Sequence, residues 1–122
     1  MVTRMKIRKV TSTNYENEMA NFKCPVTITL RKIGGRWKVL VLWTLLTGKK
    51  RYSEIKKGIP NVSEKMLIET LKELEDDGLI KRKVYPVLPP HVEYSLTPSG
   101  KKLKPVLDAM AFWGRDQREF IG

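Results

Sequence analysis

A change in hydrophobic periodicity at Gly78 constrains the fold of this chain more than any other feature. Before it, Leu67, Leu71 and Leu74 recur at the i, i+4, i+7 spacing of a helix with one buried face. After it, apolar and polar residues alternate over His91–Leu96, as in a strand with one buried face. Gly78 itself suits the position just past a helix C-terminus. The chain is therefore expected to combine helices with a short β-structure.

The alternating segment is expected to be one strand of a β-hairpin. Val92, Tyr94 and Leu96 would point to the same face of this strand. Its partner strand is expected over Leu79–Tyr85, and the proline-rich segment Pro86–Pro90 would make a stiff tip between them.

Four helices are expected before the hairpin, and two of them open on a clear start signal. Pro25 suits the first position of a helix, because its missing N–H costs nothing there. Ser63 is a good N-cap for the fourth helix. The second helix is apolar on nearly every side, which predicts a place in the middle of the fold. The expected segments are Pro25–Ile33, Arg36–Leu46, Tyr52 to about Ile59, and Ser63–Asp77.

A last helix is expected to begin at Thr97-Pro98, with Thr97 as its N-cap and Pro98 as its first residue. Pro105 should bend this helix, because proline lacks an N–H and clashes with the preceding turn. The apolar stripe of the helix is large for so small a core, so we expect it to pack against a two-fold mate. The alternative is that it closes the subunit's own core. The stripe consists of Leu103, Val106, Leu107, Met110 and Trp113.

The order of helices and hairpin is that of a winged helix-turn-helix, a mainly α fold with a small β-hairpin wing. N- and C-terminal helices would serve dimerisation. We expect one domain over residues 24–122, with the helix-turn-helix at about 51–77, the wing at 79–97 and the C-terminal dimerisation helix at 98–114. Residues 1–23 lack sustained apolar spacing and are expected to form an arm, either a mobile tail, a short strand or a short helix.

The charge of the chain indicates what such a fold would bind. It has 24 Lys and Arg against 13 Asp and Glu, a formal net charge of +11, which attracts polyanions such as nucleic acid or an anionic membrane. A membrane is not expected as a partner, because the longest apolar run, Val39–Trp43, is far shorter than the ~20 residues that span a bilayer. No apolar signal segment is visible either, and a cytoplasmic protein is expected.

The single cysteine and single histidine argue against an enzyme. Cys24 and His91 leave no zinc-ligand set and no catalytic dyad, so no catalytic residue, metal or cofactor is expected. Cys24 would lie at a helix N-cap beside Lys23, where the helix dipole and the cation favour the thiolate, which makes it a candidate redox sensor. The alternative is a small buried residue that only packs.

The helix over Ser63–Asp77 is expected to contact bases. In a helix-turn-helix the second helix lies in the major groove with its N-terminal residues near base edges. The acids of this helix gather at its C-terminal end, so phosphates would be tolerated only at the N-terminal end. The alternative is a solvated face with a Lys65/Glu69 pair. The residues expected to contact bases are Ser63, Lys65, Met66, Glu69 and Thr70.

Residues around this helix are expected to contact the DNA backbone. Phosphate contacts set register and orientation but carry no base information. Tyr85 and His91, which flank the hairpin tip, are expected to contact a minor groove or the DNA backbone. The set is Lys49, Lys50, Arg51, Lys81, Arg82, Lys83, Tyr85 and His91.

From Cys24 to about Gly114 the chain resembles the HxlR-type winged helix-turn-helix regulators, relatives of the MarR group. Several segments carry this resemblance, and their common order makes it specific. They are Cys24-Pro25-Val26, Ile33-Gly34-Gly35 with Trp37, Arg51-Tyr52-Ser53-Glu54-Ile55, Ser63 through Glu75 with Lys65-Met66-Leu67 and Leu71-Lys72-Glu73-Leu74-Glu75, Gly78-Leu79, Val84-Tyr85-Pro86, Pro89-Pro90, Val92-Glu93-Tyr94-Ser95-Leu96-Thr97-Pro98, Gly100 and Trp113-Gly114.

The resemblance implies a homodimer, paired largely through its N- and C-terminal helices, that binds palindromic operator DNA and represses or activates nearby genes. In some members a cysteine at the position matching Cys24 senses electrophiles or oxidants. Members often carry polar Thr or Gln and a basic residue where this chain has Ile68, Glu69 and Thr70. The resemblance therefore does not predict which DNA base sequence this chain recognises.

The expected function is therefore that of a sequence-specific regulator of transcription with two partners, double-stranded DNA and a second copy of the chain. A small-molecule or electrophile effector is left open, as are the operator and the sign of regulation. The alternative is a non-specific architectural DNA- or RNA-binding protein. An enzyme or a pure interaction module is a third class, which would need a catalytic constellation that the sequence lacks.

Overall fold

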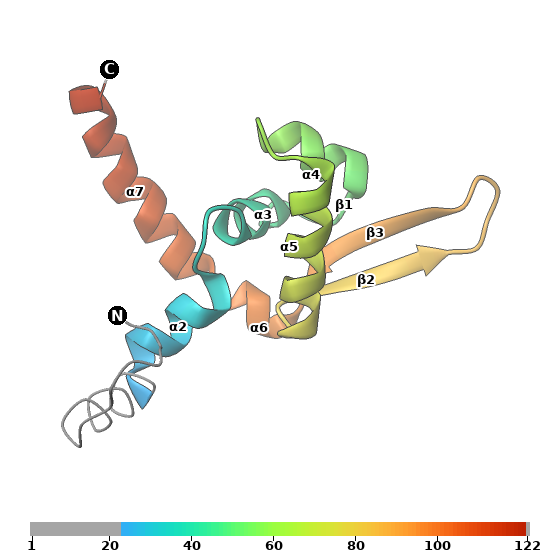
Figure 1. Cartoon of the computed structure of the whole chain (residues 1–122), viewed down its shortest axis with the longest axis horizontal. Helices are drawn as coiled ribbons and strands as arrows, with labels where there is room; N and C mark the ends of the chain where they lie inside the picture. The colour runs from blue at the N-terminus through green and yellow to red at the C-terminus, as the bar shows by residue number, and fades with distance from the viewer. Residues whose placement is uncertain (1–22, 122) are drawn as a thin grey trace, which may run out of the picture. The chain divides into compact units, whose positions relative to one another are not determined.

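The computed structural model describes residues 23–121, which belong to two compact units, residues 1–34 and 35–122. The arm expected over residues 1–23 lies outside the described residues, apart from Lys23. The elements are α2 (Pro25–Ile33), α3 (Lys38–Leu45), β1 (Lys50–Arg51), α4 (Tyr52–Gly58), α5 (Glu64–Asp76), β2 (Ile80–Tyr85), β3 (His91–Leu96), α6 (Pro98–Lys101) and α7 (Lys104–Ile121), as Figure 1 shows.

Helix α2, in the first unit, begins at Pro25 as the sequence predicted. Cys24 precedes it as the N-cap residue, in an extended conformation. The helix ends at Gly34, whose N–H donates to the Leu30 carbonyl oxygen at 2.7 Å. Val26 and Leu30 are exposed, so α2 leaves apolar surface open.

Helix α3 is less enclosed than its composition predicted. Val41, Leu42 and Leu45 are buried, whereas Leu40 and Trp43 are 41% and 40% exposed. The prediction of a helix surrounded by the fold is therefore wrong. Only one side of α3 faces the core, and the apolar side chains of the other side remain at the surface.

The core of the second unit is built around α3, α5 and the sheet. Helix α3 contacts α4 and α5, and α5 contacts β2. An ion pair also joins α3 to α5, with Lys38 Nζ 3.5 Å from Glu73 Oε1. The leucine stripe of α5 is buried as predicted. The buried apolar residues of this unit are Val41, Leu42, Leu45, Ile55, Ile59, Val62, Leu67, Leu71, Leu74, Leu79, Ile80, Leu96 and Leu107.

The predicted hairpin is confirmed, and it belongs to a sheet of three antiparallel strands. Strands β2 and β3 pair with Val84 opposite Val92. Strand β1 pairs with the other edge of β3, with Lys50 opposite Tyr94, which gives the order β1-β3-β2. The sequence did not predict β1, because two basic residues have no strand pattern of their own and become a strand only by pairing.

The C-terminal segment forms two helices rather than one bent helix. Helix α6 stops at Lys101 and α7 starts at Lys104, so that Pro105 lies in the first turn of α7. The predicted bend is wrong because the Pro105 ring would clash with the carbonyl of residue 101 in a continuous helix, and the chain breaks before it. Thr97 is the predicted N-cap of α6, with its hydroxyl oxygen accepting the Gly100 N–H at 3.1 Å.

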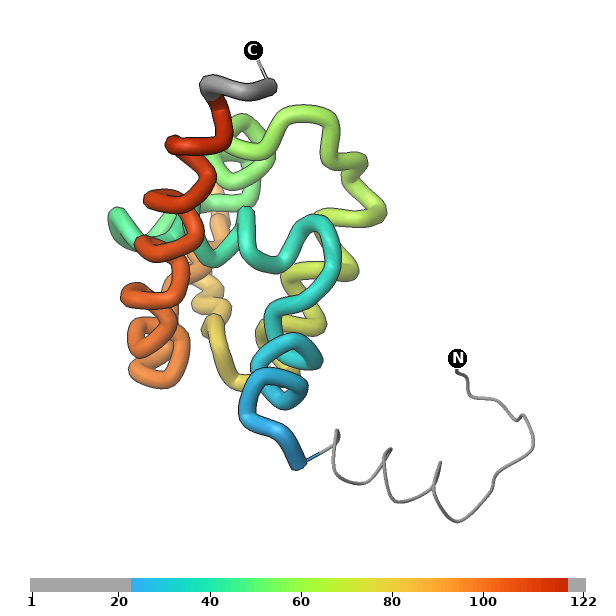
Figure 2. Tube along the Cα trace, turned by 90° about the vertical axis from the view of Figure 1, so that its left-hand side faces the viewer, coloured from blue at the N-terminus to red at the C-terminus, as the bar shows by residue number. Residues whose placement is uncertain are grey.

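The hairpin and α7 leave opposite sides of the second unit. In Figure 1 the β2–β3 hairpin extends to the right of α5, and α7 lies to the left of α3. Figure 2 turns that left-hand side towards the viewer and shows α7 in front. The surfaces predicted for DNA contact and for dimer contact are therefore separate.

Gly100 permits a close approach between α6 and the start of β2. A Cβ at this buried position would collide with the Leu79 carbonyl oxygen and lie 3.3 Å from Leu96 Cδ2. Because backbone cannot give way easily, we expect Gly100→Ala to lower the free energy of unfolding by ~1–3 kcal/mol, which urea denaturation will measure. Gly114→Ala is the matched control, since nothing lies within 4 Å of its added Cβ. Equal stability of the two variants would contradict the expectation.

Candidate nucleic-acid interface

Helix α5 begins at the N-cap that the sequence predicted. The Ser63 hydroxyl oxygen accepts the Met66 N–H at 3.1 Å, which satisfies one of the free N–H groups of the first turn. Lys65, Glu69 and Lys72 are exposed. At about 100° per residue, they lie on the side of the helix away from Leu67. The outward face of α5 is thus mainly polar.

Thr70 does not belong to this outward face. Its side chain is 4% exposed, buried among apolar residues. Thr70 is three positions after Leu67 and four before Leu74, which places it on their side of the helix. The prediction that Thr70 contacts a base is wrong, because its hydroxyl is not available at the surface of α5.

Sequence reasoning missed Ile68, which is 55% exposed on α5. At about 100° per residue it lies beside Lys65 and Lys72 on the outward face. A large apolar side chain within a polar helix face is the signal that could have identified it. Ile68 is a candidate contact residue of the same surface.

The hairpin carries basic side chains on both of its faces. Lys81, Arg82 and Lys83 are all exposed along β2. Because side chains alternate along a strand, Lys81 and Lys83 project from one face and Arg82 from the other. The wing can therefore present cations to phosphates on either side.

Tyr85 and His91 meet at the end of the hairpin. They are opposite each other in the register, and their rings stack with centroids 4.7 Å apart and planes 19° apart. Lys83 Nζ lies 4.9 Å from the centroid of the Tyr85 ring. The structure thus brings three of the predicted residues together in one basic, aromatic cluster.

Sequence reasoning also missed Glu93, an acid within this basic surface. Its Oε1 lies 3.6 Å from Lys49 Nζ, and its Oε2 lies 3.4 Å from His91 Nε2. Burial raises the pKa of Glu93, but a hydrogen bond with Tyr85 and the charges of Lys49 and His91 outweigh this effect, so its pKa is lowered overall. Glu93 is the one acid between Leu79 and Thr97 in the sequence, which is the signal that could have identified it.

The basic run before α4 is partly engaged within the chain. Lys50 Nζ donates to Thr47 Oγ1 at 2.9 Å, and the Arg51 backbone N–H donates to Glu54 Oε1 at 2.8 Å. The side chains of Lys49 and Arg51 are exposed. Of the three cations in this run, Lys50 is therefore the least exposed.

Cys24 lies half-buried at the N-cap of α2, as predicted. The backbone N–H groups of Thr27 and Val26 lower the pKa of its thiol below the ordinary value. This direction agrees with the effect expected at the start of a helix.

The predicted apolar stripe of α7 divides between core and surface. Leu107 is 1% exposed, so the prediction that it lies in a dimer interface is wrong, since it closes the core of its own chain. Leu103 is half-buried. The other three predicted residues, Val106, Met110 and Trp113, remain exposed, and with the neighbouring Pro105 and Ala109 they form a surface that is called the α7 stripe below.

Residues 23–121 contain no group of three or more His, Cys, Asp or Glu residues that could hold a metal ion. No helix among these residues combines the length and the apolar character needed to cross a membrane.

Comparison with known proteins assigns this chain to a helix-turn-helix family. A family model described as HxlR-like helix-turn-helix matches residues 32–121. The uncharacterized HTH-type transcriptional regulator YkvN of Bacillus subtilis is 52% identical over 96 residues, which cover 79% of this chain and 81% of YkvN.

Solved structures share the fold as well. The redox regulator HypR in its oxidized form superposes with a TM-score of 0.73 at 44% identity, covering 76% of this chain and 96% of HypR. A putative MarR-family regulator from Porphyromonas gingivalis W83 gives a TM-score of 0.74 at 42% identity, covering 88% of this chain and 97% of that one. The predicted winged-helix fold is confirmed.

Proposed function

Because this chain belongs to the HxlR-like helix-turn-helix family, whose matching relatives are transcriptional regulators, we propose that it binds a palindromic operator in double-stranded DNA as a homodimer. One observation carries the proposal. The exposed polar face of α5 lies on a helix that packs against β2, the strand with the basic run. The helix proposed to contact bases and the wing proposed to contact phosphates thus belong to the same compact unit.

The outward face of α5 is proposed to read bases in the major groove. A lysine can donate to guanine, a glutamate can accept from cytosine, and an apolar side chain can contact the methyl group of thymine. Lys65, Glu69 and Ile68 supply these three kinds of group and are all exposed. Ser63 and Met66 stand at the N-terminal end of the same helix, where the helix enters the groove.

The basic residues of the wing are proposed to hold the DNA backbone. Lys81, Arg82 and Lys83 are exposed on both faces of β2, and Tyr85 with His91 extends this surface to the hairpin tip. Lys49 and Arg51 add cations beside β3, where Glu93 limits the local positive charge. Such contacts position the protein without selecting a sequence.

The homodimer is proposed to form through the α7 stripe. Its large members Val106, Met110 and Trp113 are 39%, 48% and 66% exposed, and exposed apolar side chains gathered on one helix face favour contact with another protein surface. Two copies related by a two-fold axis would bring two α5 helices to successive turns of DNA, ~34 Å apart.

Footprinting on DNA selected from a random pool tests this function. We expect protection of an inverted repeat whose half-sites are ~10 bp apart. A footprint without two-fold symmetry, or equal protection of every duplex, would instead support the non-specific architectural alternative.

Base contacts and phosphate contacts should respond differently to mutation. We expect Lys65→Ala to change which sequence is preferred, at ~1–3 kcal/mol for a good base contact. Arg82→Ala should weaken binding to matched and scrambled DNA alike and reduce the salt dependence, because a phosphate contact releases counterions. Competition assays at several salt concentrations measure both effects. If the two variants lose the same factor on both DNAs, the assignment of α5 to the groove is wrong.

A thiol response is proposed as a second property, because Cys24 has a lowered pKa at the α2 N-cap and HypR, a redox regulator, has the same fold. Two Cys24 thiols from two copies would lose two hydrogens to an oxidant such as diamide and form an intersubunit disulfide. Such a bridge needs the two Cα atoms within ~7 Å. An adduct with a small thiol or an electrophile is the other route.

Replacing Cys24 separates sensing from packing. We expect Cys24→Ser to keep operator affinity under reducing conditions and to lose the response to diamide, since no thiol remains to react. Operator binding before and after oxidation measures this, with wild type as the reference. Identical binding by both proteins before and after diamide would mean that Cys24 only packs.

A further inference from the structure

A groove at the root of the hairpin brings together four lysines that are far apart in the sequence. It is lined by the end of α3, the sheet and the α6–α7 segment, and its volume is 480 Å³, within the range of about 300–1,000 Å³ typical of small-molecule sites. No Asp or Glu is among its lining residues. It is called the lysine groove below, and its lysines are Lys49, Lys81, Lys101 and Lys104.

The register of the sheet explains how two of these lysines come together. Lys81 on β2 is opposite Ser95 on β3. Because Lys50 is opposite Tyr94 on the other edge of β3, the same register continued by one residue puts Lys49 beside Ser95. Residues in one row across a sheet project from the same face. The two lysines therefore flank Ser95 on one face of the sheet.

This face of the sheet points away from the helix proposed to contact bases. Ile80, the neighbour of Lys81 on β2, is buried, and β2 contacts α5. Because side chains alternate along a strand, Lys81 projects from the face opposite Ile80. Lys101 of α6 and Lys104 of α7 add their charges to the same groove. The lysine groove is therefore separate from the outward face of α5.

The positive charge of the lysine groove is only partly neutralised within residues 23–121. Among these residues, neither Lys81 nor Lys101 forms an ion pair, and the other two lysines each pair with one acid that does not line the groove. Leu45 and Leu96 also line the groove and are buried. Charges attract each other more strongly beside such apolar surface than in bulk water. The groove therefore favours an anion with several charges.

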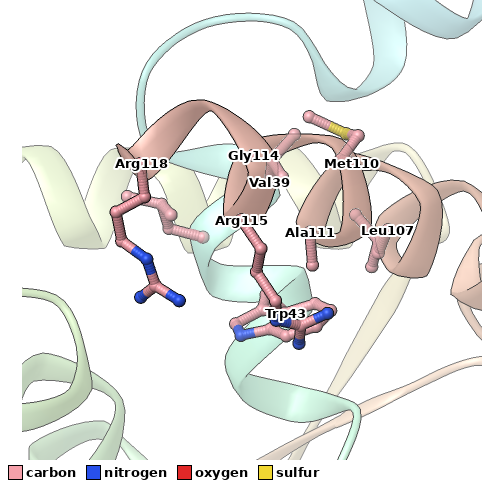
Figure 3. A pocket seen from close by; sticks show the side chains of 9 residues that line it. Val39, Trp43, Leu107, Met110, Ala111, Gly114, Arg115 and Arg118 are labelled. Carbon is pink, nitrogen blue, oxygen red and sulfur yellow. The ribbon is translucent and has the colours of Figure 1, made fainter. Parts of the chain in front are cut away.

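A second pocket of the same unit has a different chemistry. Figure 3 shows this pocket, which α3 and α7 line and in which Arg115 and Arg118 are the only cations among the lining residues. No lysine lines it. An arginine fork fits one planar carboxylate or one phosphate, whereas lysine ammonium groups are compact point charges that can each pair with a different phosphate oxygen. Four lysines around one groove suit a chain of phosphates.

We propose that the lysine groove binds a small molecule with two or more adjacent phosphates, of the class of nucleoside di- and triphosphates. The phosphates would lie between the row of the sheet that holds Lys49 and Lys81 and the two lysines of α6 and α7. The backbone phosphates of DNA share this chemistry, and the test below separates the two sources. If the chain binds DNA as proposed, a bound polyphosphate would occupy Lys49 and Lys81 and weaken operator binding, a consequence that rests on the proposed function.

Calorimetric titration of the full chain without DNA, at physiological ionic strength, tests the site with ATP and AMP. We expect ATP to bind at one site per chain and ~10-fold or more tighter than AMP, because its additional phosphates gain charge-assisted hydrogen bonds. Lys101→Gln/Lys104→Gln should weaken ATP binding by ~10-fold or more for the same reason. Lys57→Gln/Lys102→Gln is the matched control, because it removes the same charge from exposed positions outside the groove and should bind ATP as wild type does.

Four results would overturn the proposal. Equal affinity for ATP and AMP would show that adjacent phosphates are not recognised, and an equal loss of ATP binding in both lysine variants would show that only the net charge attracts ATP. Loss of ATP binding in Arg115→Gln/Arg118→Gln, with the lysine variants unaffected, would place ATP in the pocket of Figure 3.

The fourth result is the absence of ATP binding to the wild type. If Lys101→Gln/Lys104→Gln then also weakened binding to scrambled DNA, the lysine groove would hold DNA backbone phosphates instead. Because the titration contains no DNA, its failure leaves the footprint and the proposed function untouched.

Discussion

Replacing Trp113 with Asp is expected to convert the protein into a monomer and to weaken operator binding by ~100-fold or more, because linking two half-site contacts commonly raises affinity by 10²–10⁴. Trp113 is 66% exposed on the α7 stripe, so its loss removes little packing within the single chain. In the proposed dimer a carboxylate at this position would be buried against apolar side chains without a partner, which is costly.

Sedimentation equilibrium and operator titration measure the two parts of this prediction. Phe112→Asp is the matched control, because Phe112 is 69% exposed on the next position of α7 and does not line the α7 stripe. We expect Phe112→Asp to remain a dimer. A dimeric Trp113→Asp protein with unchanged operator affinity would show that dimerisation does not use this stripe.

Replacing Leu67 with Ala is expected to lower the free energy of unfolding by ~2–5 kcal/mol, the usual cost of removing a fully buried leucine side chain. Leu67 has no exposed surface, and it lies in the middle of the buried face of α5. A cavity there would loosen the contact of α5 with α3. Because small domains are stable by only ~5–15 kcal/mol, a loss of this size would leave a substantial unfolded fraction on warming.

Ile68→Ala is the matched control for Leu67→Ala, since it removes a similar side chain from the neighbouring, exposed position of the same helix. We expect its stability to change by less than ~0.5 kcal/mol. Chemical denaturation at equal protein concentration compares the variants, because any dimer stability depends on concentration. If Ile68→Ala destabilised the protein as much as Leu67→Ala, the orientation of α5 would be wrong. Ile68→Ala should nevertheless alter DNA sequence preference if Ile68 contacts a base.

Local patterns in the sequence were sufficient for the main helices and the hairpin. The leucine spacing of α5, its Ser63 N-cap and the alternation over β3 are properties of neighbouring residues, and each depends only on helix or strand geometry. For the same reason Cys24 could be placed at the N-cap of α2 from Pro25 alone. The order of these elements indicates a winged helix-turn-helix, whereas the resemblance to the HxlR-type family rests on the sequence segments themselves.

Other features depend on contacts between residues that are distant in the sequence. Strand β1 exists because Lys50 meets Tyr94 on β3, and the environment of Glu93 depends on Lys49, more than forty positions earlier. The hydrophobic periodicity of one segment does not indicate which other segment will pack against it.

The sequence by itself determined the fold class, the positive charge and the set of residues from which a DNA-binding surface is chosen, because these follow from composition and from local geometry. Only the tertiary structure decided which side chains are buried and which are exposed. It buried Thr70 beside Leu67 and Leu74, enclosed Leu107 in the core and left Ile68, Trp43 and Trp113 at the surface. The physical reason is that an apolar or polar residue at the edge of a helix face is buried or exposed according to the neighbour that packs there, and that neighbour comes from elsewhere in the chain.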